Sequence, residues 1–150
     1  MVFSELVLRW DNRKIKSDRQ SQRDFLDFVI DGKSLYQTFE TISYDLISCL
    51  GWGLQDEQQQ AKLRLTLQAS TDFPNQRQSL YICPECGDLG CGAISLRVVE
   101  QSGLIIWQDF GYENNFEDCV HWVPELTNLG PFRFDLNDYK GTILKAPSCM

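Results

Sequence analysis

Short turns separate a series of apolar runs in the middle of the chain, and this pattern constrains the fold more than any other feature. Leucines alternate with polar residues over 62–68, which is typical of a strand with one buried face. Further apolar runs follow at 80–83, 93–99 and 104–110, and the last two are joined by a connection that contains Gly103. Strands joined by such short turns pair with their neighbours. The sequence therefore predicts an antiparallel β-meander.

The N-terminal part of the chain predicts two more strands and a helix. Apolar residues over 6–10 and 25–30 indicate strands that pair across the polar segment between them. Ser34 is a good helix N-cap, and an apolar stripe with helical spacing runs from there to Cys49. We expect an amphipathic helix in this region, with a break near Ser43 where the residues are mediocre helix formers.

The C-terminal part predicts a strand over 132–136 and a last helix over 137–146. With 150 residues, of which 43% are hydrophobic, the chain is long enough for one core. We therefore expect a single α+β domain over 1–150, with one or two helices packed on an antiparallel sheet.

The overall charge restricts the partners and the compartment. The net charge of −7 disfavours binding to nucleic acid or to anionic lipid, since both need a basic face. The chain has no apolar run of transmembrane length and no basic, apolar leader at its start, so we expect a cytoplasmic protein that binds no membrane. Its cysteines should then be reduced or bound to metal.

Basic residues gather in one segment, between Arg13 and Arg23. This segment holds five basic residues and a single acid, Asp18. Polar residues fill the rest of it, so the sequence predicts a loop that is exposed to solvent.

The turn Cys83-Pro84-Glu85-Cys86-Gly87-Asp88-Leu89-Gly90-Cys91-Gly92 is the most unusual segment of the chain. Cys83 and Cys86 have the C-x2-C spacing of a zinc knuckle, and Cys91 is a third thiol within reach. Cys119 and His121 are the candidates for a fourth ligand, because residues two apart on a strand share a face.

Two other interpretations of this turn stay open. The first is a redox pair or disulfide at Cys83 and Cys86, although no thioredoxin-like βαβ pattern surrounds the pair. The second is a set of reduced cysteines with no bound ion and hence no cofactor.

The two remaining cysteines lie outside the turn. Cys49, in an apolar run, is expected to be a buried, inert thiol, and Cys149 is expected to have no role.

A stretch that mixes acids with aromatic residues lies between Val98 and Phe132 and contains no Lys or Arg. Aromatic side chains can anchor a protein interface, and acids attract a basic partner. The alternative is that the aromatic residues belong to the core. The candidate partner-binding residues are Asp109, Tyr112, Glu113, Phe116, Glu117, Asp118 and Trp122.

No complete catalytic set is visible in the sequence. The single histidine, His121, limits general acid–base chemistry. Asp109-Phe110-Gly111 matches the kinase magnesium motif, but the chain is far too short for a kinase. We therefore expect a protein that is not an enzyme.

Several segments resemble a family of small uncharacterised bacterial proteins that carry the CPECGDLGCG turn, some of which are called oxidoreductases. The resemblance lies in the cysteine turn, in 107–113, in 129–135 and in the opening strands. By its size and acidity the chain also resembles the immunity proteins of bacterial toxin systems, including contact-dependent growth inhibition.

These observations lead to two hypotheses of function. The first is an immunity protein that covers the active site of a cognate toxin domain, such as a basic nuclease, since a chain of −7 is attracted to such a partner. The second is a small zinc-binding or thiol-redox protein that uses Cys83, Cys86 and Cys91.

Overall fold

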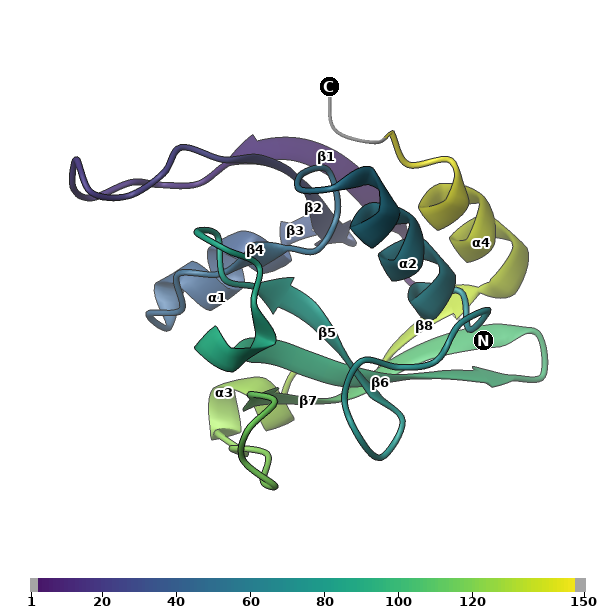
Figure 1. Ribbon diagram of the computed structural model, residues 1–150. Coiled ribbons are helices and arrows are strands. Elements are labelled where there is room, and N and C mark those ends of the chain that lie inside the picture. The colour runs from purple at the N-terminus through teal and green to yellow at the C-terminus, as the bar shows by residue number, and fades with distance from the viewer. Residues whose placement is uncertain (1–2, 148–150) are drawn as a thin grey trace.

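The computed structural model describes residues 3–147 and places two antiparallel sheets with four α-helices around one core (Figure 1). Cys149 lies outside the described residues. The elements, in chain order, are β1 (Leu6–Asn12), β2 (Asp24–Ile30), β3 (Lys33–Ser34), α1 (Leu35–Thr41), β4 (Ile47–Ser48), α2 (Gln55–Leu65), β5 (Arg77–Ile82), the 3-10 turn η1 (Leu89–Cys91), β6 (Ala93–Gln101), β7 (Leu104–Glu113), α3 (Pro124–Thr127), β8 (Phe132–Asp135) and α4 (Leu136–Leu144). The predicted α+β class is confirmed.

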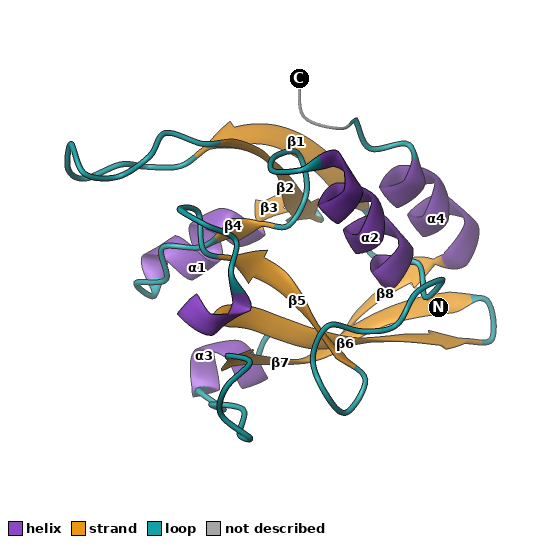
Figure 2. Ribbon diagram, in the orientation of Figure 1, coloured by secondary structure: helices purple, strands orange, loops and turns teal. Residues whose placement is uncertain are grey.

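The sheets have the orders β1-β2-β3 and β4-β5-β6-β7-β8. In the larger sheet β5, β6 and β7 form the meander expected from the short connections, and β8 pairs with β7 after the longer segment 114–131. Backbone hydrogen bonds link the two sheets on both sides, from Leu26 N–H to the Leu50 carbonyl (2.9 Å) and from Ser4 N–H to the Arg133 carbonyl (2.7 Å). The strands therefore curl into a half-barrel, with α2 and α4 side by side at one end (Figure 2).

The strand predicted over 62–68 is wrong, because α2 occupies most of this range. Gln55–Leu65 is rich in good helix formers, with acids in the first turn and bases in the last, which suits the helix dipole. Ala61 and Leu65, four residues apart, are buried on one face. Leu67, which completed the apparent alternation, lies beyond the helix with a positive φ of 61°.

The helix predicted after Ser34 is confirmed only in its first part. The Ser34 side chain accepts a hydrogen bond from Gln37 N–H, as the capping pattern indicated. The helix ends at Thr41, and Ser43 adopts a φ of 73°, so the expected break is present. After it the chain is extended, and Ile47 and Ser48 pair with β5 instead of continuing the apolar stripe of a helix.

The core lies between the curled sheet and the two long helices. Trp107 is fully buried there, and its indole N–H donates to the Tyr139 hydroxyl (3.1 Å). That hydroxyl donates to the Leu65 carbonyl (2.7 Å), which ties α4 to the end of α2. Within residues 3–147, no helix has both the length and the apolar character that crossing a bilayer requires.

Candidate metal centre

The cysteine turn connects the end of β5 to the start of β6 in the larger sheet. The backbone reverses at once after β5, where Gly87 N–H donates to the Cys83 carbonyl (2.9 Å). Gly87 has a φ of 70°, which a residue with a side chain rarely adopts. The Asp88 side chain then caps η1 by accepting from Gly90 N–H (2.8 Å). This double reversal brings Cys91 back toward Cys83 and Cys86.

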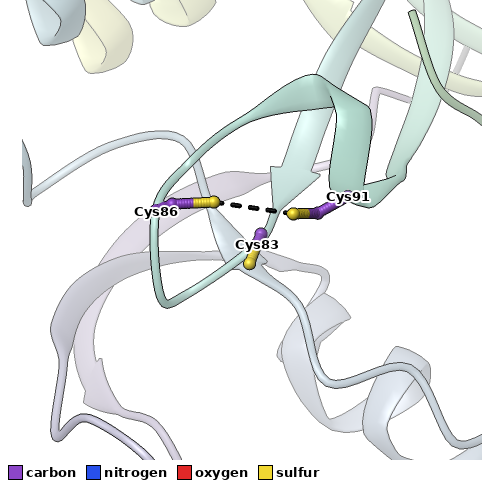
Figure 3. Close-up of side chains that lie close together, drawn as sticks. All are labelled: Cys83, Cys86 and Cys91. Carbon is purple, nitrogen blue, oxygen red and sulfur yellow. Dashed lines mark hydrogen bonds between the residues drawn. The ribbon is translucent and has the colours of Figure 1, made fainter. Parts of the chain in front are cut away.

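The three thiols of the turn form one cluster, in which all the sulfurs lie within 4.8 Å of one another. The sulfurs of Cys86 and Cys91 are 3.5 Å apart and point toward each other, with Cys83 beside them (Figure 3). Two thiolates on a tetrahedral zinc ion, each at about 2.3 Å, are about 3.8 Å apart. A disulfide requires about 2.05 Å. The separation therefore matches zinc ligands, and all three cysteines are free.

The surroundings of the sulfurs shift the pKa values of two of the thiols in opposite directions. Burial alone raises the pKa of Cys83, but the N–H groups of Cys86 and Glu85 and the neighbouring thiols outweigh it, so this pKa lies below its ordinary value. The hydrogen bond with Cys86 and the charge of Cys83 raise the pKa of Cys91 to about 11. Cys83 thus ionises more readily than an ordinary thiol, and Cys91 ionises less readily.

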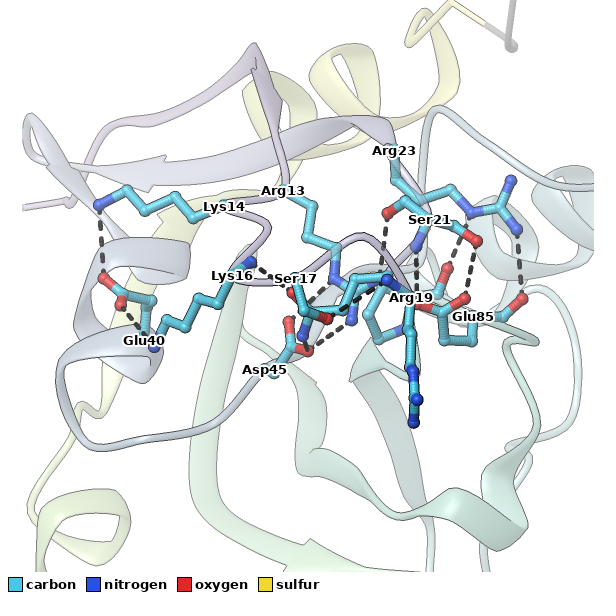
Figure 4. A network of polar contacts seen from close by, with 12 residues as sticks. Arg13, Lys14, Lys16, Ser17, Arg19, Ser21, Arg23, Glu40, Asp45 and Glu85 are labelled. Carbon is cyan, nitrogen blue, oxygen red and sulfur yellow. Dashed lines mark hydrogen bonds and ion pairs between the residues drawn. The ribbon is translucent and has the colours of Figure 1, made fainter.

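Glu85, inside the C-x2-C pair, anchors the turn to the rest of the molecule. Its carboxylate forms an ion pair with Arg13 and accepts from the Ser21 N–H (2.9 Å) and the Ser21 hydroxyl (2.7 Å). These contacts lower the pKa of Glu85 to about 2. Arg23 adds a hydrogen bond from its Nε to the Pro84 carbonyl (2.8 Å). Figure 4 shows this network. We call residues 13–23, which contact the cysteine turn through Arg13, Ser21 and Arg23, the basic strap.

The prediction of a solvated loop over 13–23 is therefore wrong for Arg13. Its side chain is only 3% exposed and also binds both oxygens of Asp45, at 3.1 and 2.5 Å. Lys14 and Lys16 do face solvent, and both lie near Glu40. The burial of Arg13 could not be predicted from the local sequence, because the two acids that bind it are 32 and 72 residues away.

Tyr112 covers the far end of the turn. Its hydroxyl donates to the Cys91 carbonyl (3.4 Å) and lies where a Cβ on Gly92 would be, at 1.9 Å. Gly92 also has a φ of 91°, so a glycine is required here on two grounds. The Tyr112 ring stacks on Tyr44, with centroids 5.1 Å apart. The expected partner-binding residue Tyr112 is thus half-buried and supports the turn.

The structure does not bring Cys119 and His121 into the cluster of the turn. A separate group forms instead, in which donor atoms of Glu117, Cys119 and His121 all lie within 4.8 Å of one another. His121 pairs with Tyr112 through two backbone hydrogen bonds of 2.7 and 3.2 Å, and its ring centroid is 6.3 Å from that of Tyr112. The fourth position on an ion at the turn is therefore not filled by the predicted residues in this conformation.

The candidate partner-binding residues divide into exposed and buried ones. Phe116 and Trp122 are 73% and 54% exposed, and they flank the exposed acids Glu117 and Asp118. Asp109 is exposed too, at a bulge of β7 where its φ is 58°, and its carboxylate is 4.0 Å from Arg97.

Glu113 departs from the expectation. Its side chain is 6% exposed, and it accepts hydrogen bonds from Arg77 Nε (2.7 Å) and the Ser95 hydroxyl (2.5 Å). The Arg77 guanidinium also lies over the Trp122 ring, 4.8 Å from its centroid. Glu113 therefore has a structural role, and its carboxylate cannot contact a partner unless its ion pair with Arg77 breaks.

A cavity of about 440 Å³ opens between the cysteine turn and α2. Cys86 and Gly87 line one side, and Trp52, which stacks under Arg23 at 5.0 Å, lines another. Cys49 also borders it, and burial raises the pKa of this thiol to about 11, consistent with the inert cysteine that the sequence predicted.

Comparison of the chain with protein-family models, with curated proteins and with solved structures found no match.

Proposed function

We propose that the protein binds zinc and that Cys83, Cys86 and Cys91 supply the ligands. The observation that carries the proposal is the convergence of three thiols, all within 4.8 Å, in one turn. Thiolate sulfur is a preferred ligand of zinc, and the C-x2-C spacing is common among zinc knuckles. The cluster thereby supports the second hypothesis from the sequence more directly than the first.

The electrostatics of the turn support a cation at this position. Cys91 has a raised pKa because thiols and negative charge surround it, and a dication would reverse that effect and deprotonate it. Arg13 and Arg23 bind oxygen atoms of the turn, namely those of the Glu85 carboxylate and of the Pro84 and Glu85 backbone carbonyls. The strap therefore fixes the turn without occupying its sulfurs.

An ion bound here would have a structural role. The turn is the chain connection between β5 and β6, and the basic strap rests on it, so the ion would stabilise the connection and the strap together. Three protein ligands leave one coordination position for water or for another ligand. A redox role for the same thiols makes the opposite prediction, since it requires reactive thiols in a metal-free protein.

Metal analysis of the purified full chain tests this proposal. We expect zinc at the turn, lost in Cys83→Ser and in Cys86→Ser and retained in Cys49→Ala, which removes a thiol outside the cluster. We also expect that a chelator lowers the melting temperature of the wild type by more than that of either serine variant. A wild type that binds no zinc, or serine variants that hold as many zinc ions per chain as the wild type, would refute the proposal.

A second candidate function is the binding of a basic protein, as in an immunity protein that covers a toxin domain. The observation that favours it is the pair of exposed rings, Phe116 and Trp122, beside Glu117 and Asp118 in a stretch without Lys or Arg. Cationic toxin domains such as nucleases would be attracted to this surface.

This second function is tested with the C-terminal domain of a large secreted protein, where a neighbouring gene encodes one. In Glu117→Lys and Asp118→Lys the association should slow and its salt dependence should flatten, because both acids are exposed. Glu100→Lys is the matched control, since Glu100 is an exposed acid near the β6–β7 hairpin tip. Equal association rates for all the variants would remove this surface from the interface.

A further inference from the structure

The segment after β7 carries a second group of metal-binding side chains, apart from the cysteine turn. Glu117, Cys119 and His121 alternate along the chain, and their donor atoms all lie within 4.8 Å of one another. The His121 Nε2 is 3.9 Å from Glu117 Oε1, and the Cys119 sulfur is 3.9 Å from Glu117 Oε2. One carboxylate oxygen thus faces the imidazole and the other faces the thiol.

We propose that Glu117, Cys119 and His121 bind a second zinc ion, with a coordination position left open. Sulfur, nitrogen and oxygen ligands on a tetrahedral zinc lie about 3.4 to 3.6 Å apart. The two 3.9 Å separations involve different oxygens of Glu117, and the three donor atoms lie within 4.8 Å of one another, so an ion would draw them together by up to about 1.4 Å. Exposed side chains can make such a change by rotation about their χ angles. The proposal does not depend on an ion at the cysteine turn.

The backbone holds both ends of this site in place. At one end the Asn114 side-chain oxygen Oδ1 accepts from the backbone N–H groups of Phe116 (3.1 Å) and Glu117 (2.9 Å), while its Nδ2 donates to Glu117 Oε1 (2.7 Å). At the other end His121 is bridged to Tyr112 of β7 by two backbone hydrogen bonds. The three donors are thus presented by a short, anchored segment, which reduces the entropy that binding must overcome.

The donor set favours zinc over the hard cations. A thiolate with an imidazole and a carboxylate is a combination that suits zinc, whereas calcium and magnesium prefer oxygen ligands alone. The three side chains are exposed, so an ion can enter from solvent. Three protein ligands with an open fourth position are typical of zinc sites that activate water or bind an external ligand.

The two sites make separate predictions in one experiment on the full chain. Protein dialysed against a fixed concentration of free zinc is analysed for bound metal, and a parallel sample is titrated with cobalt, whose thiolate absorption reports the number of sulfur ligands. We expect two ions per chain in the wild type and one in His121→Ala and Cys119→Ser. The ion that remains should show the spectrum of a three-thiolate site. Asp118→Asn, an exposed acid in the same segment, is the matched control and should keep both ions.

The outcomes separate this inference from the proposed function. If the wild type binds one ion that only Cys83→Ser removes, or keeps two ions in His121→Ala, the second site does not exist. A single ion that both Cys83→Ser and His121→Ala remove would also overturn it, because the two groups would then share one metal. A single ion lost in His121→Ala and retained in Cys83→Ser would support this site and refute the one at the turn.

Discussion

Arg13 and Glu85 form an ion pair that joins the start of the basic strap to the centre of the cysteine turn. The guanidinium is 3% exposed and the carboxylate side chain is 41% exposed, so the pair lies at the boundary between core and solvent. The pKa of Arg13 is raised by its hydrogen bonds with Asp45 and Glu85, although burial opposes this. Two segments 72 residues apart are therefore held in one position by charge.

Replacing the carboxylate should release the strap. In Glu85→Gln we expect severalfold faster tryptic cleavage within 13–23, because the strap would open more often once the ion pair and the charge-assisted bonds from Ser21 are gone. Limited proteolysis at neutral pH, followed by mass spectrometry, measures this. Glu40→Gln is the matched control, since Glu40 pairs only with the exposed Lys14 and Lys16 and its loss should change the rate little. Equal cleavage in the two variants would contradict the role of Glu85.

The same contact should respond to acid. The pKa of Glu85 is lowered from an ordinary value of 4.5 to about 2, so its contribution is complete above pH 4.5 and is lost as the pH falls toward 2. We expect the protection of the Ser21 amide, which donates to Glu85, to fall over this range in hydrogen exchange corrected for intrinsic rates. In Glu85→Gln the protection should be weak throughout. A wild-type profile that is flat between pH 5 and 2.5 would argue against the pair.

Local patterns in the sequence predicted most of the sheet. The hairpin of β6 and β7, the β1–β2 pair and β8 each combine alternating or continuous apolar residues with a short turn or a clear boundary. The helix α2 was missed because Leu63 and Leu65 at its end and Leu67 beyond it follow a period of two, whereas Ala61 and Leu65 follow a helical period. Tertiary packing decided between them, since Ala61 and Leu65 are buried on the same face.

The candidate sites were predictable only in part. The spacing of Cys83, Cys86 and Cys91 indicated a cluster, because a tight turn brings residues that are close in sequence together without help from tertiary contacts. The positions of Arg13 and Glu113 were not visible, since each depends on partners that only the tertiary structure brings close. Asp27 is a similar case: burial raises its pKa, while Ser34, Tyr81 and Tyr36 donate hydrogen bonds to it.

Gly92 should be intolerant of any side chain. Gly92→Ala is expected to destabilise the protein by about 2 kcal/mol or more, because it adds a clash with Tyr112, at 1.9 Å from the new Cβ, to the cost of a positive φ. Gly103→Ala isolates the second effect, since Gly103 has a φ of 81° and open space around the new Cβ. It should cost about 1 kcal/mol. Urea unfolding measures both, and equal losses would show that Tyr112 moves aside freely.

The buried pair of Arg77 and Glu113 should contribute more to folding than any exposed acid of the same stretch. Removing the charge in Glu113→Gln leaves the Arg77 guanidinium buried without its anion, and we expect a loss of about 3 kcal/mol in the free energy of unfolding. Glu117→Gln, at an exposed position with side-chain contacts to Asn114 and His121, should change it by less than about 0.5 kcal/mol. Urea unfolding of both variants at pH 7 in metal-free buffer gives the comparison. If Glu113→Gln were as stable as Glu117→Gln, Arg77 would have to be neutralised by another group, and Glu113 would again be a candidate for partner binding.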